Sequence, residues 1–430
     1  MGTSTSSFGV GKRESHDSSD FYSRFAPPEV SDDDTIGAPG ALDVIHVGDA
    51  RNMVAVPDGS VALVVTSPPY FAGKEYETAL GEGHVPGDYL DYLAMLRDVL
   101  AECARTLEPG GRLAVNVANL GRRPYRSLAT DVTTILQDDL RLLLRGEVIW
   151  QKQRGASGSC AWGSYRSPAN PVLRDTTERV IIASKGRFDR VGRGSASPGE
   201  PGVASIPGDE FMEATLDVWE IPAESATRVG HPAPFPVALV ERCIQLFTYD
   251  GDVVLDPFMG SGTTAVAAVN TGRRYVGYDT DAAYVDKARE RVASMAPAPP
   301  QDQRTLKEIA RTLLDEAGCI DVVENARVAP GVTVGFRATG PDGTERLYEL
   351  AGVNTPARPG LTRIDAVWRT IAKASVAHEV EPATPFVVLT AGTVRGGPMA
   401  AVVGEGRPVS QVIDVTGDDA LEHLAGDRAG

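Results

Sequence analysis

Residues 252 to 264 of the chain read Asp252-Val253-Val254-Leu255-Asp256-Pro257-Phe258-Met259-Gly260-Ser261-Gly262-Thr263-Thr264. The apolar, β-branched start of this stretch predicts a buried strand, and the Ala- and Val-rich residues that follow it predict a helix. Glycines let the backbone approach a ligand closely, and the first turn of a helix offers N–H groups that lack partners within the helix. The stretch therefore predicts a strand, a ligand-binding glycine turn and a helix.

An acidic residue further along the chain indicates the kind of ligand. Residues 274 to 278 predict the next strand, and Asp279 ends it. An acid roughly 20 residues after such a turn commonly binds the hydroxyls of a ribose. The dinucleotide pattern G-x-G-x-x-G is incomplete, because Ala265 replaces its last glycine. The sequence therefore indicates a nucleoside cofactor without the dinucleotide fingerprint.

A second informative stretch follows the apolar run Val61 to Val65 and consists of Thr66-Ser67-Pro68-Pro69-Tyr70. The run predicts a buried parallel strand, so these residues would lie at its carboxyl end, where open α/β sheets bind ligands. An exocyclic amine of a base is a poor nucleophile until acceptors hold its hydrogens. The Ser67 hydroxyl and a proline carbonyl can accept those hydrogens, and Tyr70 can stack on an extruded base. The alternative is a Pro-Pro turn that merely closes a strand.

Together the two stretches resemble motifs of the N4-cytosine/N6-adenine DNA amino-methyltransferases that use S-adenosylmethionine. Ser67 to Tyr70 resembles the catalytic motif of that family, and Asp256 to Thr264 is similar to its cofactor motif. His231 to Pro236 resembles the segment before the cofactor strand, except that Phe235 replaces the usual lysine. The catalytic motif comes first, as in the permuted beta arrangement. The resemblance covers residues 41 to 295 and implies a circularly permuted, Rossmann-like α/β methyltransferase fold.

The resemblance also implies roles for individual residues. The catalytic residues would be Ser67, Pro68, Pro69 and Tyr70. The cofactor would be held by Asp256, Pro257, Phe258, Gly260, Ser261, Gly262, Thr263 and Asp279, together with Asp49 and His231. The target nitrogen would attack the sulfonium methyl directly. Because a serine precedes Pro-Pro-Tyr, we expect N4 of cytosine as the target, with N6 of adenine as the alternative. Structural alternatives stay open: Asp256 capping the turn, Asp279 capping the helix that starts at Ala282, and Asp49 forming a turn.

The distribution of charge is compatible with a double-stranded DNA substrate, although the formal net charge is −16. Between Arg141 and Arg193 there are 11 basic residues and four acids, interleaved with Trp150, Trp162 and Tyr165. Basic residues among aromatic ones can follow phosphates and stack on bases. We therefore expect DNA contacts from Arg154, Trp162, Arg166 and Arg174, the alternative being an ordinary solvated face.

The 430 residues predict more than one domain. We expect a polar arm over residues 1–40 and a methyltransferase domain over 41–296, with an inserted target-recognition region at about 141–215. A linker at 297–302 would lead to a smaller α/β domain over 303–430. The expected elements there are a helix at 303–317, strands at 333–338, 347–350 and 385–390, and a helix at 362–377.

The order of these elements resembles a restriction-nuclease core with Glu349 at the place of a metal-binding acid. Ala351 replaces the lysine that such nucleases use, so we expect a module for target recognition or for a protein partner instead. The four cysteines are far apart, which predicts neither a metal site nor disulfides. No apolar run is long enough to span a membrane, and no secretory signal is evident. We expect a bacterial cytoplasmic protein that works at the nucleoid, in restriction-modification, phage defence or regulation.

Two other functions stay open at this stage. The chain could be a regulator that binds the cofactor and DNA without methylating it, or a methyltransferase of RNA or of a small molecule. The basic middle segment and the Ser-Pro-Pro-Tyr stretch argue against a small substrate.

Overall fold

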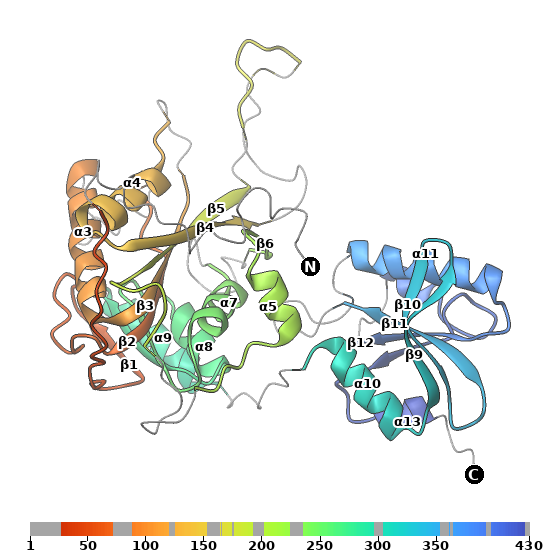
Figure 1. Cartoon of the computed structure of the whole chain (residues 1–430). Coiled ribbons are helices and arrows are strands. Elements are labelled where there is room, and N and C mark those ends of the chain that lie inside the picture. Colours follow the sequence, from red (N-terminus) through yellow and green to blue (C-terminus); the bar gives the residue numbers. More distant parts are fainter. Residues whose placement is uncertain are drawn as a thin grey trace.

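The computed structural model describes residues 27–71, 88–119, 125–152, 164, 166–173, 176–191, 202–223, 235–295, 304–352, 361, 364–392 and 397–425. They form an eight-stranded sheet with its helices, built from residues 44 to 293, and a five-stranded sheet with its helices, built from residues 306 to 425 (Figure 1). Of the expected arm, residues 27–40 are described and contain no helix or strand. The expected linker, residues 297–302, lies outside the described residues.

The larger sheet has a parallel half and an antiparallel half. In spatial order its strands are β1 (Val44–Val47), β8 (Arg274–Asp279), β7 (Val253–Asp256), β2 (Val61–Thr66), β3 (Leu107–Val117), β5 (Thr177–Ser184), β4 (Leu143–Gln151) and β6 (Val218–Glu220). The first five are parallel to their neighbours, whereas β5 runs antiparallel to both β3 and β4. The region that we assigned to target recognition, residues 141–215, therefore contributes β4 and β5 to this sheet.

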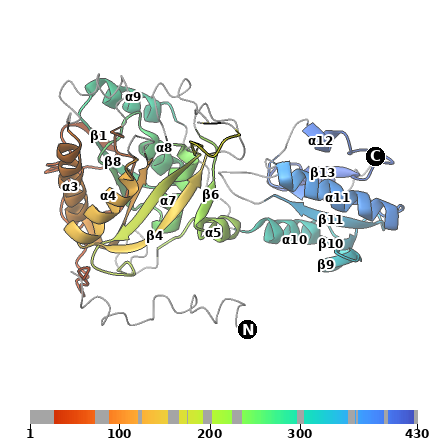
Figure 2. The ribbon, with the colours of Figure 1, turned by 90° about the horizontal axis from the view of Figure 1, so that it is seen from above.

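Helices cover both faces of this sheet (Figure 2). On one face lie α3 (Tyr89–Thr106), α4 (Leu128–Thr134) and the π-helical turn η3 (Ile135–Asp139). On the other lie α7 (Val237–Phe247), α8 (Thr263–Asn270) and α9 (Ala282–Ala293). All six residues of β2 are buried, as expected for a central parallel strand covered on both sides. This arrangement confirms the expected α/β fold with its Rossmann-like sheet.

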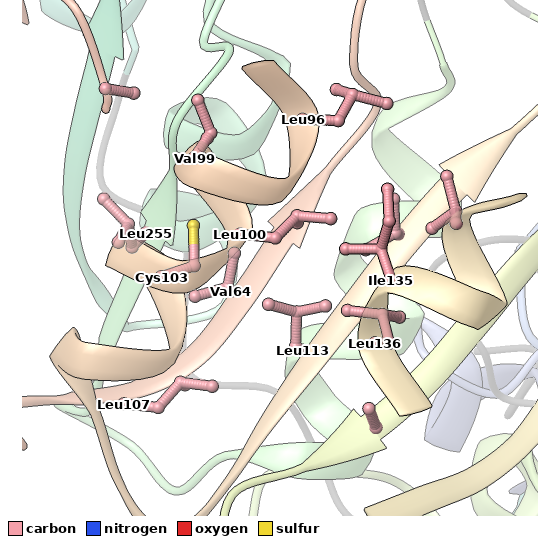
Figure 3. Packing of buried hydrophobic residues seen from close by; sticks show 14 of the residues in the cluster. Val64, Leu96, Val99, Leu100, Cys103, Leu107, Leu113, Ile135, Leu136 and Leu255 are labelled. Atoms are coloured by element: carbon pink, nitrogen blue, oxygen red, sulfur yellow. The ribbon is translucent and has the colours of Figure 1, made fainter. Parts of the chain in front are cut away.

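The core beneath α3 shows how apolar residues recur on one face of a helix. Figure 3 shows the labelled side chains of α3 and of the strands below it: Leu96, Val99, Leu100, Cys103, Val64, Leu113 and Leu255. Asp88 caps this helix, because its carboxylate accepts hydrogen bonds from the N–H groups of Leu90 and Asp91. Burial raises the pKa of the Cys103 thiol far above its usual range, which suits a packing residue rather than a nucleophile.

Buried arginines hold the chain where it returns from β5 towards the cofactor strand. The Arg190 guanidinium lies between the carboxylates of Glu108 and Asp252, 2.7 Å from each. Arg242 of α7 pairs with Glu210 of the short helix α5 (Gly208–Ala214), and both side chains are fully buried. The first pair fastens the chain after β5 to the sheet and the second fastens α5 to α7, so these charges stabilise the fold.

The smaller sheet has the order β13 (Gln411–Asp414), β12 (Phe386–Thr390), β11 (Glu345–Ala351), β10 (Val332–Thr339) and β9 (Ile320–Ala329). β9, β10 and β11 are antiparallel neighbours, whereas β11, β12 and β13 run parallel. Helix α11 (Ile364–Val380), with the short α12 (Gly397–Ala400), packs on one face, and α10 (Leu306–Glu316) and α13 (Ala420–Ala425) pack on the other. The expected elements of this part are confirmed, whereas β9 and β13 were not anticipated.

A hydrogen bond links the two parts. The N–H of Leu306, at the start of α10, donates to the carboxylate of Asp209 on α5 at 2.8 Å. Thr305 caps the same helix in a capping box with Glu308. None of the described helices is long and apolar enough to cross a membrane.

Gly262 provides a test of how tightly the glycine turn is packed. Its φ of +84° favours glycine, and a Cβ there would lie 2.8 Å from Cβ of Ala288 on α9. We predict that Gly262→Ala lowers the free energy of unfolding by roughly 3 kcal/mol, since it adds a steric clash to backbone strain. Gly272→Ala is the matched control, because its φ is +72° and nothing lies within 4 Å of the added Cβ.

The control is expected to lose only about 1 kcal/mol, the cost of the left-handed backbone alone. Urea unfolding of both variants checks the difference. An equal loss in the two would show that α9 does not constrain the turn.

Candidate active site

The two motif loops leave the sheet side by side. β2 and β7 are parallel neighbours, with Leu63 opposite Val254 and Val64 opposite Leu255. The carboxyl ends of parallel strands meet at one edge of a sheet, so the loop after Thr66 and the loop after Asp256 emerge together. The structure thus brings together two stretches that are about 190 residues apart in the chain.

Asp256, the last residue of β7, connects these two loops through hydrogen bonds. Its carboxylate accepts hydrogen bonds from the hydroxyl of Thr66 at 2.7 Å, from the hydroxyl of Thr264 at 2.6 Å, and from the N–H of Phe258 at 3.0 Å. The side chain is completely buried. These contacts hold the two loops in place, which matches the alternative that Asp256 caps the glycine turn. Direct binding of the cofactor by Asp256 stays a prediction.

Asp279 lies against the glycine turn. One carboxylate oxygen accepts the N–H of Gly260 at 2.8 Å, and the other accepts the N–H of Asp281 at 2.9 Å. The N-cap of α9 is Asp281, so the alternative that Asp279 caps this helix is wrong. The geometry instead puts a carboxylate beside the turn, as binding to a ribose requires.

Other residues of the predicted cofactor site complete the same edge. Gly48 donates to the carbonyl of Asp279 at 2.9 Å, which brings Asp49 to the end of β8. The Asp49 side chain is about half exposed and pairs with Arg51, which lowers its pKa. Ser261 and Thr263 are buried and build the turn, and Phe258 packs partly against the core. Pro257 lies in the same loop, and His231 lies outside the described residues.

The predicted catalytic loop rests on a polar network that sequence reasoning missed. The Ser67 and Tyr70 hydroxyls are 2.8 Å apart, and the Tyr70 hydroxyl donates to Glu178 of β5 at 2.9 Å. Asn116 of β3 donates to the Tyr70 oxygen at 2.9 Å and to Glu178 at 2.6 Å. Lys152 pairs with the other oxygen of the Glu178 carboxylate. The Tyr70 hydroxyl therefore points inward, and burial raises its pKa well above the usual range.

A second contact fixes the proline part of this loop. The hydroxyl of Tyr92 on α3 donates to the carbonyl of Pro69 at 2.8 Å, whereas Pro68, before it, is buried. With the Pro69 carbonyl occupied by Tyr92, the Pro68 carbonyl stays the predicted acceptor for an amine. The one signal in the sequence for this network was a polar residue next to an apolar run in each strand: Asn116 follows Leu113–Val115, and Glu178 comes shortly before Val180–Ala183.

Several residues of the basic segment between Arg141 and Arg193 stabilise the fold. Trp150, which we considered for stacking on bases, is buried and donates to the carbonyl of Ile221. Lys185 donates to two backbone carbonyls, and Arg179 pairs with Glu147. Of the predicted DNA contacts, Arg166 is exposed, and Arg154, Trp162 and Arg174 lie outside the described residues. These DNA contacts stay predictions.

The smaller sheet carries the other acid that the sequence singled out. Glu349 on β11 is buried, and Lys373 of α11 donates to its carboxylate at 2.5 Å. A lysine therefore reaches this acid from a helix instead of from the position of Ala351. Within the described residues, no group of three His, Cys, Asp or Glu side chains could hold a metal ion.

The buried Asp256 gives the larger part of the protein a measurable pH dependence. Burial raises its pKa to about 6 from 3.8, against the effect of its three donors. Because the native state then binds more protons than the unfolded chain, stability decreases as the pH rises through this interval. We predict that the free energy of unfolding of the wild type, measured relative to that of Asp256→Asn, decreases by roughly 1.4 kcal/mol when the pH is raised from about 5 to about 7.5.

Urea unfolding of both proteins across this interval measures the difference. A constant difference would contradict a raised pKa for this carboxyl group.

Comparison with known proteins identifies the family of this chain. Residues 61–290, more than half of the chain, match the N6/N4 methyltransferase family model, described as DNA methylase. The chain is 27% identical over 261 residues to the type II methyltransferase M.ScaI of Streptomyces caespitosus, covering 59% of this chain and 82% of that protein. It is 24% identical over 266 residues to the DNA adenine methyltransferase YhdJ of Escherichia coli (strain K12), covering 59% and 83%.

Among solved structures, TTHA0409 of Thermus thermophilus, complexed with S-adenosyl-L-methionine, is 31% identical; the match covers 58% of this chain and 92% of that chain, with a TM-score of 0.45. The family match spans both motif loops and the strands that carry them. The chain therefore belongs to the DNA methylase family of N6/N4 methyltransferases.

Proposed function

We propose that this DNA methylase transfers the methyl group of S-adenosylmethionine to an exocyclic amine of double-stranded DNA, namely N4 of cytosine. The observation that carries the proposal is the link through Asp256. Because Thr66 and Thr264 donate to the same buried carboxylate, the amine-binding loop and the glycine turn are fixed next to each other. Transfer between two bound groups gains most from such fixed proximity.

The residues at the glycine turn fit the proposed cofactor. Gly260 and Gly262 adopt positive φ angles of 50° and 84°, which glycine favours, and Gly260, beside Asp279, has no side chain to obstruct a nucleoside. Asp279 is oriented by the N–H of Gly260, and a carboxylate suits the hydroxyls of a ribose. Asp49, at the neighbouring strand end, offers a second carboxylate. When bound, S-adenosylmethionine supplies a methyl group on a sulfonium, which is a good leaving group.

The loop after β2 prepares the target nitrogen. An amine hydrogen donated to the Ser67 hydroxyl, and a second one donated to the Pro68 carbonyl, would localise the nitrogen lone pair. The ring of Tyr70 would stack on the extruded base. Unstacking the base from the duplex costs a few kcal/mol, which its contacts in the site would offset. The nitrogen would then form a bond to the methyl carbon as the carbon–sulfur bond breaks, and it would release one proton to solvent.

Cytosine is the proposed base because a serine precedes Pro-Pro-Tyr, as is more common in N4-cytosine enzymes of this type. Adenine N6 is the alternative, and the name of the Escherichia coli relative favours it. For the smaller sheet, residues 306 to 425, we propose a role in target recognition or in binding a protein partner, since no group of three acidic, histidine or cysteine side chains in its described residues could hold a metal ion.

The experiment combines the full chain with labelled S-adenosylmethionine and duplex DNA, followed by digestion to nucleosides and mass spectrometry. We expect labelled N4-methylcytosine. Ser67→Ala should lower the transfer rate by on the order of 100-fold, because it removes one acceptor of the amine, while cofactor affinity stays unchanged. Ser294→Ala, at the exposed end of α9, is the control and should keep the full rate.

Labelled N6-methyladenine without methylcytosine would overturn the choice of base. Binding of DNA and cofactor with no methylated nucleoside would instead favour a regulatory binding protein. Label transferred to RNA in preference to duplex DNA would refute the proposed substrate.

A further inference from the structure

We propose that Glu178 is a positioning residue for methyl transfer, because it sets the direction of a hydrogen-bond chain that leaves Ser67 as an acceptor for the target amine. The inference rests on the proposed function and names a residue outside both motif loops. Glu178 is 5% exposed and lies near the start of β5, on the antiparallel side of the sheet.

Three donors surround the Glu178 carboxylate. One oxygen accepts from the Tyr70 hydroxyl and from the amide of Asn116, at 2.9 Å and 2.6 Å. The other oxygen pairs with the ammonium group of Lys152, which follows β4. An ionised carboxylate accepts hydrogen bonds and donates none. Paired with Lys152, this group is therefore a fixed acceptor at the inner end of the chain.

The Glu178 carboxylate determines the direction of the hydrogen bonds from Tyr70 and from Ser67. A tyrosine hydroxyl has one proton, and at Tyr70 that proton is donated to Glu178. The contact of 2.8 Å between Tyr70 and Ser67 can then form in one direction only, with Ser67 donating its proton to the Tyr70 oxygen. The Ser67 oxygen, which the Asn116 amide approaches to 3.4 Å, then keeps a lone pair to accept from an amine. Without the carboxylate, the Ser67 proton could turn towards the target nitrogen and compete for its lone pair.

Asn116 shows that the direction is enforced. Its amide nitrogen lies within hydrogen-bonding distance of Glu178, Tyr70 and Ser67, at 2.6, 2.9 and 3.4 Å. Its amide oxygen is buried and has no hydrogen-bond partner within the described part of the chain. A buried acceptor without a partner is unfavourable. The opposite orientation of the amide would place its oxygen against the carboxylate, so Glu178 holds Asn116 as a donor at that cost.

A purely structural role would predict a different result from this positioning role. A buried ion pair that only joins β4 to β5 would affect stability when it is removed, with no selective effect on the chemical step. A positioning role would affect the rate of transfer at saturating cofactor and DNA, because the Ser67 proton is then free to point at the amine. The effect of Glu178 would also depend on the Tyr70 hydroxyl, since the chain passes through it.

The test uses the full chain in the methylation assay, with Glu178→Gln as the main variant. We expect its kcat to fall by about 10-fold or more, while the KM for DNA and the Kd for S-adenosylmethionine change by less than about twofold. Glu210→Gln is the matched control, because it also neutralises a buried carboxylate in an ion pair, with Arg242, away from the catalytic loop. It should lose stability but keep a kcat close to that of the wild type.

Tyr70→Phe keeps the ring and removes the hydroxyl that connects Ser67 to Glu178. Its kcat should fall to a similar extent, and the double variant Tyr70→Phe/Glu178→Gln should be no slower than about the slower single variant, since both changes interrupt one chain. Tyr70→Phe also tests the inference by itself if Glu178→Gln does not fold: a kcat equal to that of the wild type would overturn it.

Other outcomes separate this inference from the proposed function. An active wild type with an equally active Glu178→Gln, or with effects that multiply in the double variant, would overturn the inference alone. A wild type that methylates no base would overturn the proposed function, and the inference with it.

Discussion

The buried carboxylate of Asp256 is the constraint on which the site depends. It lies at the end of β7 and binds the hydroxyl that ends β2 and the hydroxyl in the first turn of α8. A desolvated carboxylate is unfavourable unless donors surround it, so its three donors must stay in place. The positions of both loops are thereby coupled, because the hydrogen bond between Thr66 and Asp256 joins the end of β2 directly to the cofactor motif.

A second support lies on the opposite side of the catalytic loop. β2 has β7 on one side and β3, followed by β5, on the other. Asp256 therefore holds the loop from the parallel half of the sheet, and Asn116 and Glu178 hold it from the half that leads into the antiparallel strands. The Tyr92 hydroxyl adds a contact from α3 to the Pro69 carbonyl. Fixing a reactive loop from several elements reduces the reorganisation that a reaction requires.

The sequence was sufficient to predict the elements that carry the site. β-branched runs predicted β2 and β7, and the glycine turn before an Ala-rich segment predicted α8. These signals are local, because apolar periodicity and glycine act on neighbouring residues. The predictions that were wrong concern residues whose environment depends on contacts across the sheet. Trp150 fits both a base-stacking surface and a core, and only the position of β4 between β5 and β6 shows that it is buried.

The polar network could not be predicted for the same reason. Tyr70 and Glu178 are 108 positions apart, and their contact requires the strand order β2, β3, β5, which no local pattern specifies. The expected cap of α9, Asp279, lies two residues before the observed cap, Asp281, a difference that periodicity does not resolve. Likewise, the partner of Glu349 came from α11 and not from its own strand.

Asp256 couples the amine-binding loop to the glycine turn through the hydroxyls of Thr66 and Thr264. The most direct measurement is the calorimetric Kd of S-adenosylmethionine for Thr66→Val, which removes one donor to Asp256 from the β2 side and leaves the turn unaltered in sequence. We expect an affinity weaker by roughly 10- to 150-fold, since one hydrogen bond to a charged group contributes about 1.5 to 3 kcal/mol. An unchanged Kd in a folded Thr66→Val protein would contradict the coupling.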